Sequence, residues 1–136
     1  MGAASQTLDE TIEYAKQRHS FGKPLAKHEG VAFQIAEHLA LGHASRLLAY
    51  EVLARADAGR PHTAEAAMAK WLGPKHAAEA IHTCMLLHGW SGYGDDQPYA
   101  QRMLDVMGLE IGDGTPEIMK AIIAREAFGR EYTAYK

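Results

Sequence analysis

The chain has 136 residues, of which 47% are hydrophobic and 23% are charged, and its formal net charge is −3. This length predicts one domain with a substantial hydrophobic core. The negative net charge and the scattered basic residues argue against a nucleic-acid or anionic-membrane partner.

The first predicted element is a helix over residues 3–17, followed by the loop SFGKPL at residues 20–25. At this corner Arg18 stands three residues before Phe21. A guanidinium here can clamp a phosphate or pyrophosphate through paired hydrogen bonds. It can equally complement the negative end of the helix dipole, and the residues alone favour this second interpretation.

The second predicted helix covers residues 28–58 and has two apolar stripes rather than one. One stripe contains Val31, Ile35 and Leu39. Two stripes predict burial on two sides, as in a helix bundle that also makes an oligomer contact. Gly59 follows the helix as a C-terminal cap.

The third predicted helix covers residues 63–87, with Thr63 as its N-cap. Pro74 lies inside this pattern, so we expect a kink or a break near residues 72–73.

Cys84, the only cysteine, sits in an apolar run and is interpreted as a buried hydrophobic residue. A chain with a single cysteine fits a reducing compartment, and we expect a cytoplasmic protein. No stretch approaches the roughly 18 apolar residues of a membrane span.

A glycine-rich loop, LHGWSGYG at residues 87–94, comes next and lets the backbone pass close to a ligand. It is not a dinucleotide-binding fingerprint, because no strand precedes it. A short helix is predicted over residues 98–107.

The stretch IGDGTPEI at residues 111–118 introduces the last predicted helix, which runs from Thr115 to about residue 131. Thr115 is the expected N-cap, and Pro116 fits the first helical position. The free N–H groups of such a helix start suit an anion or a polar cofactor tail. Asp113, between two glycines, is either a favourable charge near the helix start or a group placed for close approach to a substrate.

Together these elements predict an all-α domain over residues 1–136, built as an antiparallel, up-and-down four-helix bundle with a short extra helix. The chain has eight histidines. Neighbouring histidines such as His38 and His43, or His76 and His82, lack the spacing of three or four residues that places two ligands on one helix face. We therefore expect no metal site.

Several of these motifs occur in a recognisable order. Arg-x-x-Phe-Gly-Lys-Pro-Leu at residues 18–25 is followed by a long helix pair, the glycine-rich loop, and Asp-Gly-Thr-x-Glu-Ile at residues 113–118. With Ala-Arg-Glu at residues 124–126, this order resembles the C-terminal α-helical domain of acyl-CoA dehydrogenases. The resemblance covers residues 2–129. It implies an FAD-dependent protein that removes the α-proton of an acyl-CoA thioester and passes a β-hydride to the flavin.

The resemblance also implies roles for individual residues. Arg18 and Phe21 match the pair that reaches FAD across a subunit interface. Asp113 matches the catalytic base, and Gly114 lies beside the thioester. The remaining matched positions contact the cofactor; they are His88, Gly89 and Trp90 in the glycine-rich loop, and Thr115 and Glu117 after the base.

The chain departs from the family pattern at these sites. Asp113 is one methylene shorter than the usual glutamate, and Gly112 replaces a bulky aromatic residue, which opens room beside the base and the substrate. Leu86 and Glu29 replace cofactor-contacting glutamines, and Leu104 replaces a frequent arginine. These departures fit three alternatives: an active dehydrogenase with a shifted substrate, a divergent subunit of a heteromer, or a weak flavin binder.

The expected function is therefore that of the C-terminal domain of an acyl-CoA dehydrogenase, which contributes FAD contacts, a base and oligomer contacts. Its expected partners are an acyl-CoA substrate, the N-terminal and middle β domains that these 136 residues do not contain, and other subunits of a homo-oligomer or heteromer. Taken alone, these residues are expected to be inactive. The alternative is a helical module that serves oligomerisation without catalysis.

Overall fold

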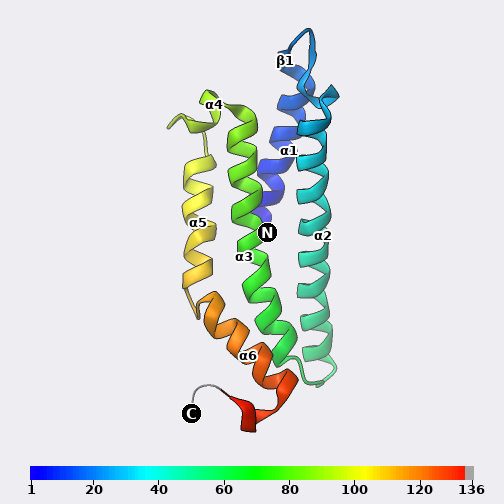
Figure 1. Ribbon diagram of the computed structural model, residues 1–136, viewed down its shortest axis with the longest axis vertical. Helices are drawn as coiled ribbons and strands as arrows, with labels where there is room; N and C mark the ends of the chain where they lie inside the picture. The colour runs from blue at the N-terminus through cyan, green and yellow to red at the C-terminus, as the bar shows by residue number, and fades with distance from the viewer. Residues whose placement is uncertain (134–136) are drawn as a thin grey trace.

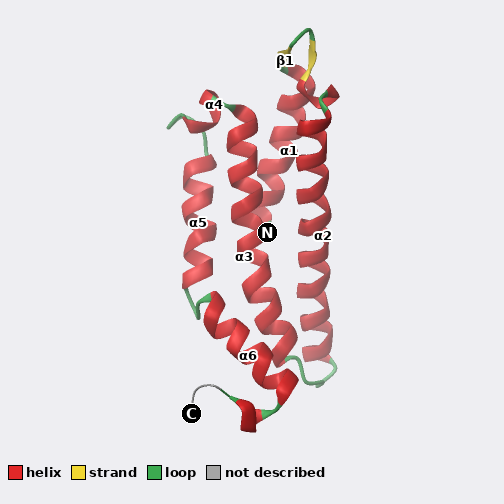
Figure 2. Ribbon diagram, viewed as in Figure 1, coloured by secondary structure: helices red, strands yellow, loops and turns green. Residues whose placement is uncertain are grey.

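The computed structural model describes residues 1–133 and consists almost entirely of long helices standing side by side (Figures 1 and 2). The long helices are α1 (Gly2–Gln17), α2 (Glu29–Asp57), α3 (Thr63–His88), α5 (Tyr99–Ile111) and α6 (Pro116–Phe128). The short elements are the strands β1 (His19–Ser20) and β2 (Lys23–Pro24), the one-turn helix α4 (Trp90–Tyr93), and the 3-10 turns η1 (Leu25–Lys27) and η2 (Arg130–Tyr132).

Helix α3 is the centre of the bundle, because α1, α2, α5 and α6 all pack against it. In Figure 1, α1 and α3 run upward while α2 runs downward, and α5 and α6 follow each other downward along α3. Helix α1 covers the upper half of α3, whereas α6 crosses its lower half. The predicted all-α, antiparallel up-and-down bundle is confirmed, with α5 and α6 together forming its fourth rod.

The core lies where α1, α3 and α5 meet. It is made largely of small residues, which let the helix backbones approach closely. Its buried members are Ala4, Leu8, Ala77, Ala80, Ile81, Cys84 and Val106. Cys84 is fully buried, as the sequence predicted. Burial raises the pKa of its thiol, which favours an unreactive, protonated side chain.

Polar contacts fix how the helices are turned toward one another. Arg102 on α5 donates to both carboxylate oxygens of Glu10 on α1, at 2.6 and 3.0 Å, and to the Thr7 hydroxyl at 3.0 Å. Between α2 and α3, His38 pairs with the Thr83 hydroxyl at 2.9 Å. Such bonds have strict geometry, so they select one rotation of each helix where apolar packing alone would allow several.

Helix α2 keeps a row of large apolar side chains on its outer side. Leu47, Tyr50 and Leu53 follow three-residue steps and are more than half exposed. Ser45 is the one buried residue of α2. This exposed row is not the second stripe that the sequence indicated (Leu41, Ala44, Leu48 and Val52), because Leu41, Leu48 and Val52 are half-buried. No helix among the described residues is long and apolar enough to cross a membrane.

Several local expectations were wrong. Of the kink or break expected near Pro74, the break does not occur, because α3 continues through this residue; Figure 1 shows the axis of α3 changing direction along its length. Its N-cap is His62 rather than Thr63. The segment expected to be a plain loop contains the β1–β2 hairpin. Helix α5 extends to Ile111, four residues beyond its predicted end, and α6 ends at Phe128 because Gly129, at φ 106°, leaves the helical region.

The core predicts a specific pattern of stability. Ile81 is 0% exposed, so Ile81→Ala should lower the free energy of unfolding by about 2–5 kcal/mol, because it removes buried methylenes and leaves a cavity. Leu86→Ala, on the same helix but 66% exposed, should change it by less than about 0.5 kcal/mol. Urea unfolding of both variants measures the difference. Equal losses in the two variants would contradict the assigned core.

Candidate functional site

The first cluster of predicted site residues lies at the corner where α1 ends and α2 begins. Strands β1 and β2 pair with Ser20 opposite Lys23, so Phe21 and Gly22 form the two-residue turn between them. Phe21 has φ 50° and Gly22 has φ 77°. Asn and Gly are preferred in such a turn, and a bulky aromatic residue at positive φ is strained. The Phe21 ring is 96% exposed at the tip of this turn.

Arg18 and the glycine-rich loop share one groove of about 380 Å3. Trp90, which is 85% exposed, borders it together with the backbone of Gly89. Gly89 has φ 62°, and open space surrounds the position where a Cβ would stand. The structure thus brings together Arg18, Gly89 and Trp90, which are far apart in the sequence. An exposed guanidinium beside an indole and bare backbone suits a ligand that has both phosphate and an aromatic ring. We call this groove with the β1–β2 hairpin the Arg18 corner.

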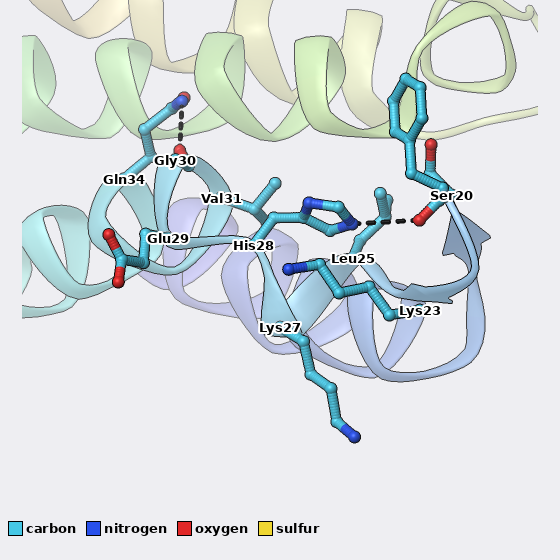
Figure 3. Close-up of a pocket in the computed structure, with 10 residues that line it drawn as sticks. Ser20, Lys23, Leu25, Lys27, His28, Glu29, Gly30, Val31 and Gln34 are labelled. Carbon is cyan, nitrogen blue, oxygen red and sulfur yellow. Dashed lines mark hydrogen bonds between the residues drawn. The ribbon is translucent and has the colours of Figure 1, made fainter.

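A second hollow of about 700 Å3 lies at the start of α2 (Figure 3). Lys23 and Lys27 border it, and His28 bonds to the Ser20 carbonyl through Nε2 at 3.1 Å. Figure 3 shows the Glu29 side chain turned away from Lys23 and His28. This carboxylate therefore does not face the cationic groups of the hollow.

His88 borders the Arg18 corner, but its ring is held by the bundle. The ring stacks on Tyr14 at 4.0 Å between centroids, and its Nε2 lies 3.2 Å from both the Thr11 and the Tyr99 hydroxyls. Burial lowers the pKa of His88, with Glu10 opposing this shift. The neutral ring thus joins α1, α3 and α5 just below the glycine-rich loop. Its contacts are those of a support for that loop.

The second cluster is the segment between α5 and α6, which we call the Asp113 loop (residues 112–115). Gly112 closes α5 by donating its N–H to the Gly108 carbonyl at 2.9 Å. Asp113 has φ 57° and Gly114 has φ 115°, so the chain makes a left-handed turn at both residues. A Cβ on Gly114 would lie 2.6 Å from Cε of the buried Met119, so this position accepts only glycine without rearrangement. The Asp113 side chain is exposed.

Helix α6 starts from this loop as predicted, with Thr115 at the N-cap and Pro116 at the first helical position. The Thr115 side chain makes no hydrogen bond to the helix start. The pKa of Glu117 is lowered, first by its own backbone N–H and then by the Thr115 hydroxyl. The Glu117 carboxylate therefore occupies its own backbone N–H at the start of α6.

The two clusters are separate places on one chain. In Figure 1 the hairpin stands at the upper end of the bundle, and the Asp113 loop lies lower down, beyond α5. Helix α5 has 13 residues, and at 1.5 Å per residue it spans about 20 Å between the end of the glycine-rich region and the Asp113 loop. The structure thus joins Arg18 to the glycine-rich loop, but it does not join Arg18 to Asp113.

The family model described as "Acyl-CoA dehydrogenase, C-terminal domain" matches residues 1–128. The chain belongs to the acyl-CoA dehydrogenase family. One relative is acryloyl-CoA reductase (NADH) from Anaerotignum propionicum. The two are 35% identical over 130 residues, which make up 96% of this chain and 33% of that relative.

Solved structures agree with this assignment. Butyryl-CoA dehydrogenase from Megasphaera elsdenii matches with a TM-score of 0.89 and 31% identity, over 93% of this chain and 33% of that one. An FAD complex of PigA matches with a TM-score of 0.90 and 28% identity over the same shares. The chain spans about a third of the length of the relatives and structures that it matches.

Sequence reasoning missed two features of this acyl-CoA dehydrogenase family chain. The first is the packing of Tyr14 and Tyr99 around His88, which no local motif signals. The second is Lys70 on α3, whose Nζ donates to the carbonyls of Leu109 at 2.6 Å and Gly114 at 3.2 Å. These contacts span 39 and 44 residues of sequence, so only the folded chain reveals them. Within residues 1–133, no group of three or more His, Cys, Asp or Glu side chains is arranged to hold a metal ion.

The lowered pKa of His88 predicts how stability depends on pH. The folded chain disfavours a charged His88. Below the ordinary histidine pKa of 6.5, the unfolded chain therefore binds more protons than the folded chain, which stabilises the unfolded state. The free energy of unfolding should fall as the pH drops from about 7 to about 5, and less steeply in His88→Gln. Glu10, whose pKa is also lowered, loses its contribution only below its ordinary 4.5. Urea unfolding at several pH values checks this, and identical slopes in both proteins would contradict it.

Proposed function

We propose that this chain is the C-terminal helical domain of an FAD-dependent acyl-CoA dehydrogenase and that Asp113 is its catalytic base. One observation carries the proposal: a carboxylate stands exposed on left-handed backbone between two glycines, at the gap between α5 and α6. Left-handed backbone at a non-glycine residue is costly and persists where the surroundings enforce it, often at functional sites. In the family pattern, this position belongs to the base.

Asp113 would act on the α-proton of an acyl-CoA thioester. A general base must lie within about 2.6–3.2 Å of the atom that carries its proton, or act through one water. Gly112 and Gly114 flank it without side chains, so a substrate can approach the carboxylate closely, and Gly114 would stand beside the thioester. The shorter reach of aspartate is then met by a substrate that lies nearer to the loop backbone.

FAD is the cofactor of this family, and one of the similar solved structures is an FAD complex. When bound, FAD supplies the acceptor for the hydride from the β-carbon. The Arg18 corner fits part of such a cofactor: the guanidinium would bind the pyrophosphate, and Gly89 and Trp90 would line the adenine end. His88 would hold this loop in place from below.

The two clusters would serve two different flavins. Because α5 separates them by about 20 Å, the Asp113 loop with Thr115 and Glu117 would contact the flavin of its own subunit. Arg18 and the exposed ring of Phe21 would reach the flavin of a neighbouring subunit, which explains why the strained hairpin points outward. The flavin ring itself would be held by domains outside these residues.

Assembly is the second role that we propose. The uncovered row of Leu47, Tyr50 and Leu53 on α2 is an apolar surface of the kind that subunit contacts bury. The other domains of the dehydrogenase would cover exposed apolar residues of α5, such as Leu104 and Leu109. The same surfaces would be kept by a module that only assembles, which is the alternative function. Flavin content and turnover of the complete protein distinguish an active dehydrogenase from a module that only assembles.

Replacing the proposed base tests the catalytic claim. In the complete protein, Asp113→Asn should lower kcat by about 10²–10⁴-fold, because it removes the general base. Flavin content should be unchanged, since Asn has the same shape and also tolerates left-handed backbone. Anaerobic dye reduction by an acyl-CoA, together with the flavin absorbance, measures both quantities. If turnover survives, the base lies elsewhere. If the correctly folded wild-type protein is colourless, the assembly-only alternative holds.

The Arg18 corner makes a separate prediction. Arg18→Ala should weaken FAD binding by about 10–100-fold, because one charge-assisted interaction with a phosphate contributes about 1.5–3 kcal/mol. Arg60→Ala, an exposed arginine in the turn between α2 and α3, is the matched control and should leave the affinity unchanged. Flavin retained after gel filtration gives the comparison. Equal retention by both variants would remove Arg18 from the flavin site.

The isolated chain offers a further check. The 136 residues should show no dehydrogenase activity when FAD and an acyl-CoA are added, because the groups that would hold the flavin ring are not among them. Single-chain turnover in the same dye assay would refute this expectation.

A further inference from the structure

The side chain of Lys70 bridges the last turn of α5 and the Asp113 loop. It extends from α3 and ends at two backbone carbonyls. The Leu109 carbonyl accepts from Nζ at 2.6 Å, and the Gly114 carbonyl accepts at 3.2 Å. These carbonyls lie four residues before Asp113 and one residue after it.

Neither carbonyl has a partner in the regular bonding of the helices. The last bond of α5 runs from the Gly112 N–H to Gly108, so the carbonyls that follow Gly108 lack a helical donor. The first bond of α6 runs from the Met119 N–H to Thr115, so Gly114 stands before it. Lys70 thus supplies donors where both helices leave the backbone unpaired. A three-donor ammonium is suited to hold two carbonyls at once.

We propose that Lys70 is a positioning residue that holds Asp113 in its reactive orientation. This inference rests on the proposed role of Asp113 as base. The loop between the two clamped carbonyls contains two successive left-handed residues, Asp113 and Gly114. Such a turn has competing conformations, and each would aim the carboxylate differently. By fixing the backbone on both sides, Lys70 leaves the Asp113 side chain one direction, away from the bundle and toward the substrate.

Loss of a positioning residue should change the reaction rate, whereas loss of a purely structural residue should change how the helices pack. Helix α6 stays attached to α3 by other contacts, among them buried Met119 and Lys120, whose ammonium lies 5.0 Å from the centre of the Trp71 ring. Removing the Lys70 ammonium should therefore release the loop without undocking the helices. A displacement of about 1 Å at a reacting group can cost about 100-fold in rate.

Lys70→Met keeps the aliphatic stem and removes the donors, so it is the main test. In the complete, flavin-loaded protein it should lower kcat by about 10–100-fold with little change in KM. The isotope effect on the α-carbon C–H bond should rise, because proton removal becomes slower. Lys70→Arg should restore most of the rate, since a guanidinium can also donate to two carbonyls. Lys75→Met, on the same helix in a surface ion pair with Glu79, is the control and should behave as wild type.

The double variant Lys70→Met/Asp113→Asn shows whether the proposed role of Lys70 or the proposed role of Asp113 is wrong. If Lys70 acts through Asp113, the double variant should be no slower than Asp113→Asn alone. A normal rate in Lys70→Met, while Asp113→Asn is inactive, overturns the role of Lys70 and leaves the proposed function standing. Turnover in Asp113→Asn overturns both. If Lys70→Met loses its flavin or melts early, Lys70→Arg decides: a folded but slow arginine variant contradicts the proposal, and a fast one supports it.

Discussion

Close packing along one face of α3 is the constraint on which the rest of this structure depends. On that face the small side chains of Ala77, Ala80 and Cys84 let α1 and α5 lie close to α3, and Ile81 fills the core between them. Helix α1 is too short to cover all of α3, and the lower half is covered by α6 instead. The fourth rod must therefore change direction between α5 and α6. That change of direction is the Asp113 loop, so the position of the proposed base follows from how the bundle is packed.

Both proposed sites combine strained backbone with an outward-pointing side chain. Phe21 and Asp113 are the two non-glycine residues with positive φ among those described. Each such residue costs on the order of 1–3 kcal/mol and needs enforcement from its surroundings. Near Phe21 the enforcement comes from strand pairing and from the Leu25 N–H, which donates to the Arg18 carbonyl at 2.8 Å. At Asp113 it comes from Gly114, packed against Met119, and from Lys70. The bundle is thus a rigid frame that presents two side chains to groups outside it.

Helix periodicity and capping residues predicted the bundle well, because amphipathic helices of this length leave few ways to bury their apolar faces. Gly59 and Pro116 marked helix ends by local backbone chemistry, which acts within a few residues, whereas the end of α6 at Gly129 was not predicted. Pro74 does not break α3, because packing on both sides keeps the helix continuous where an isolated helix would end. The sequence placed Asp113 correctly before a helix, but it gave no sign of Lys70 or of the ring cluster around His88. Those contacts join residues that meet only when the helices are packed.

The central claim is that Asp113 is held at the α-carbon of a bound acyl-CoA. It is tested most directly by a crystal structure of the complete flavoprotein with an unreactive acyl thioester bound. The expected result is an Asp113 carboxylate oxygen about 3–3.5 Å from the α-carbon, with Nζ of Lys70 still bonded to the carbonyls of Leu109 and Gly114. An Asp113 side chain directed away from the ligand, with a different carboxylate at the α-carbon, would contradict the claim.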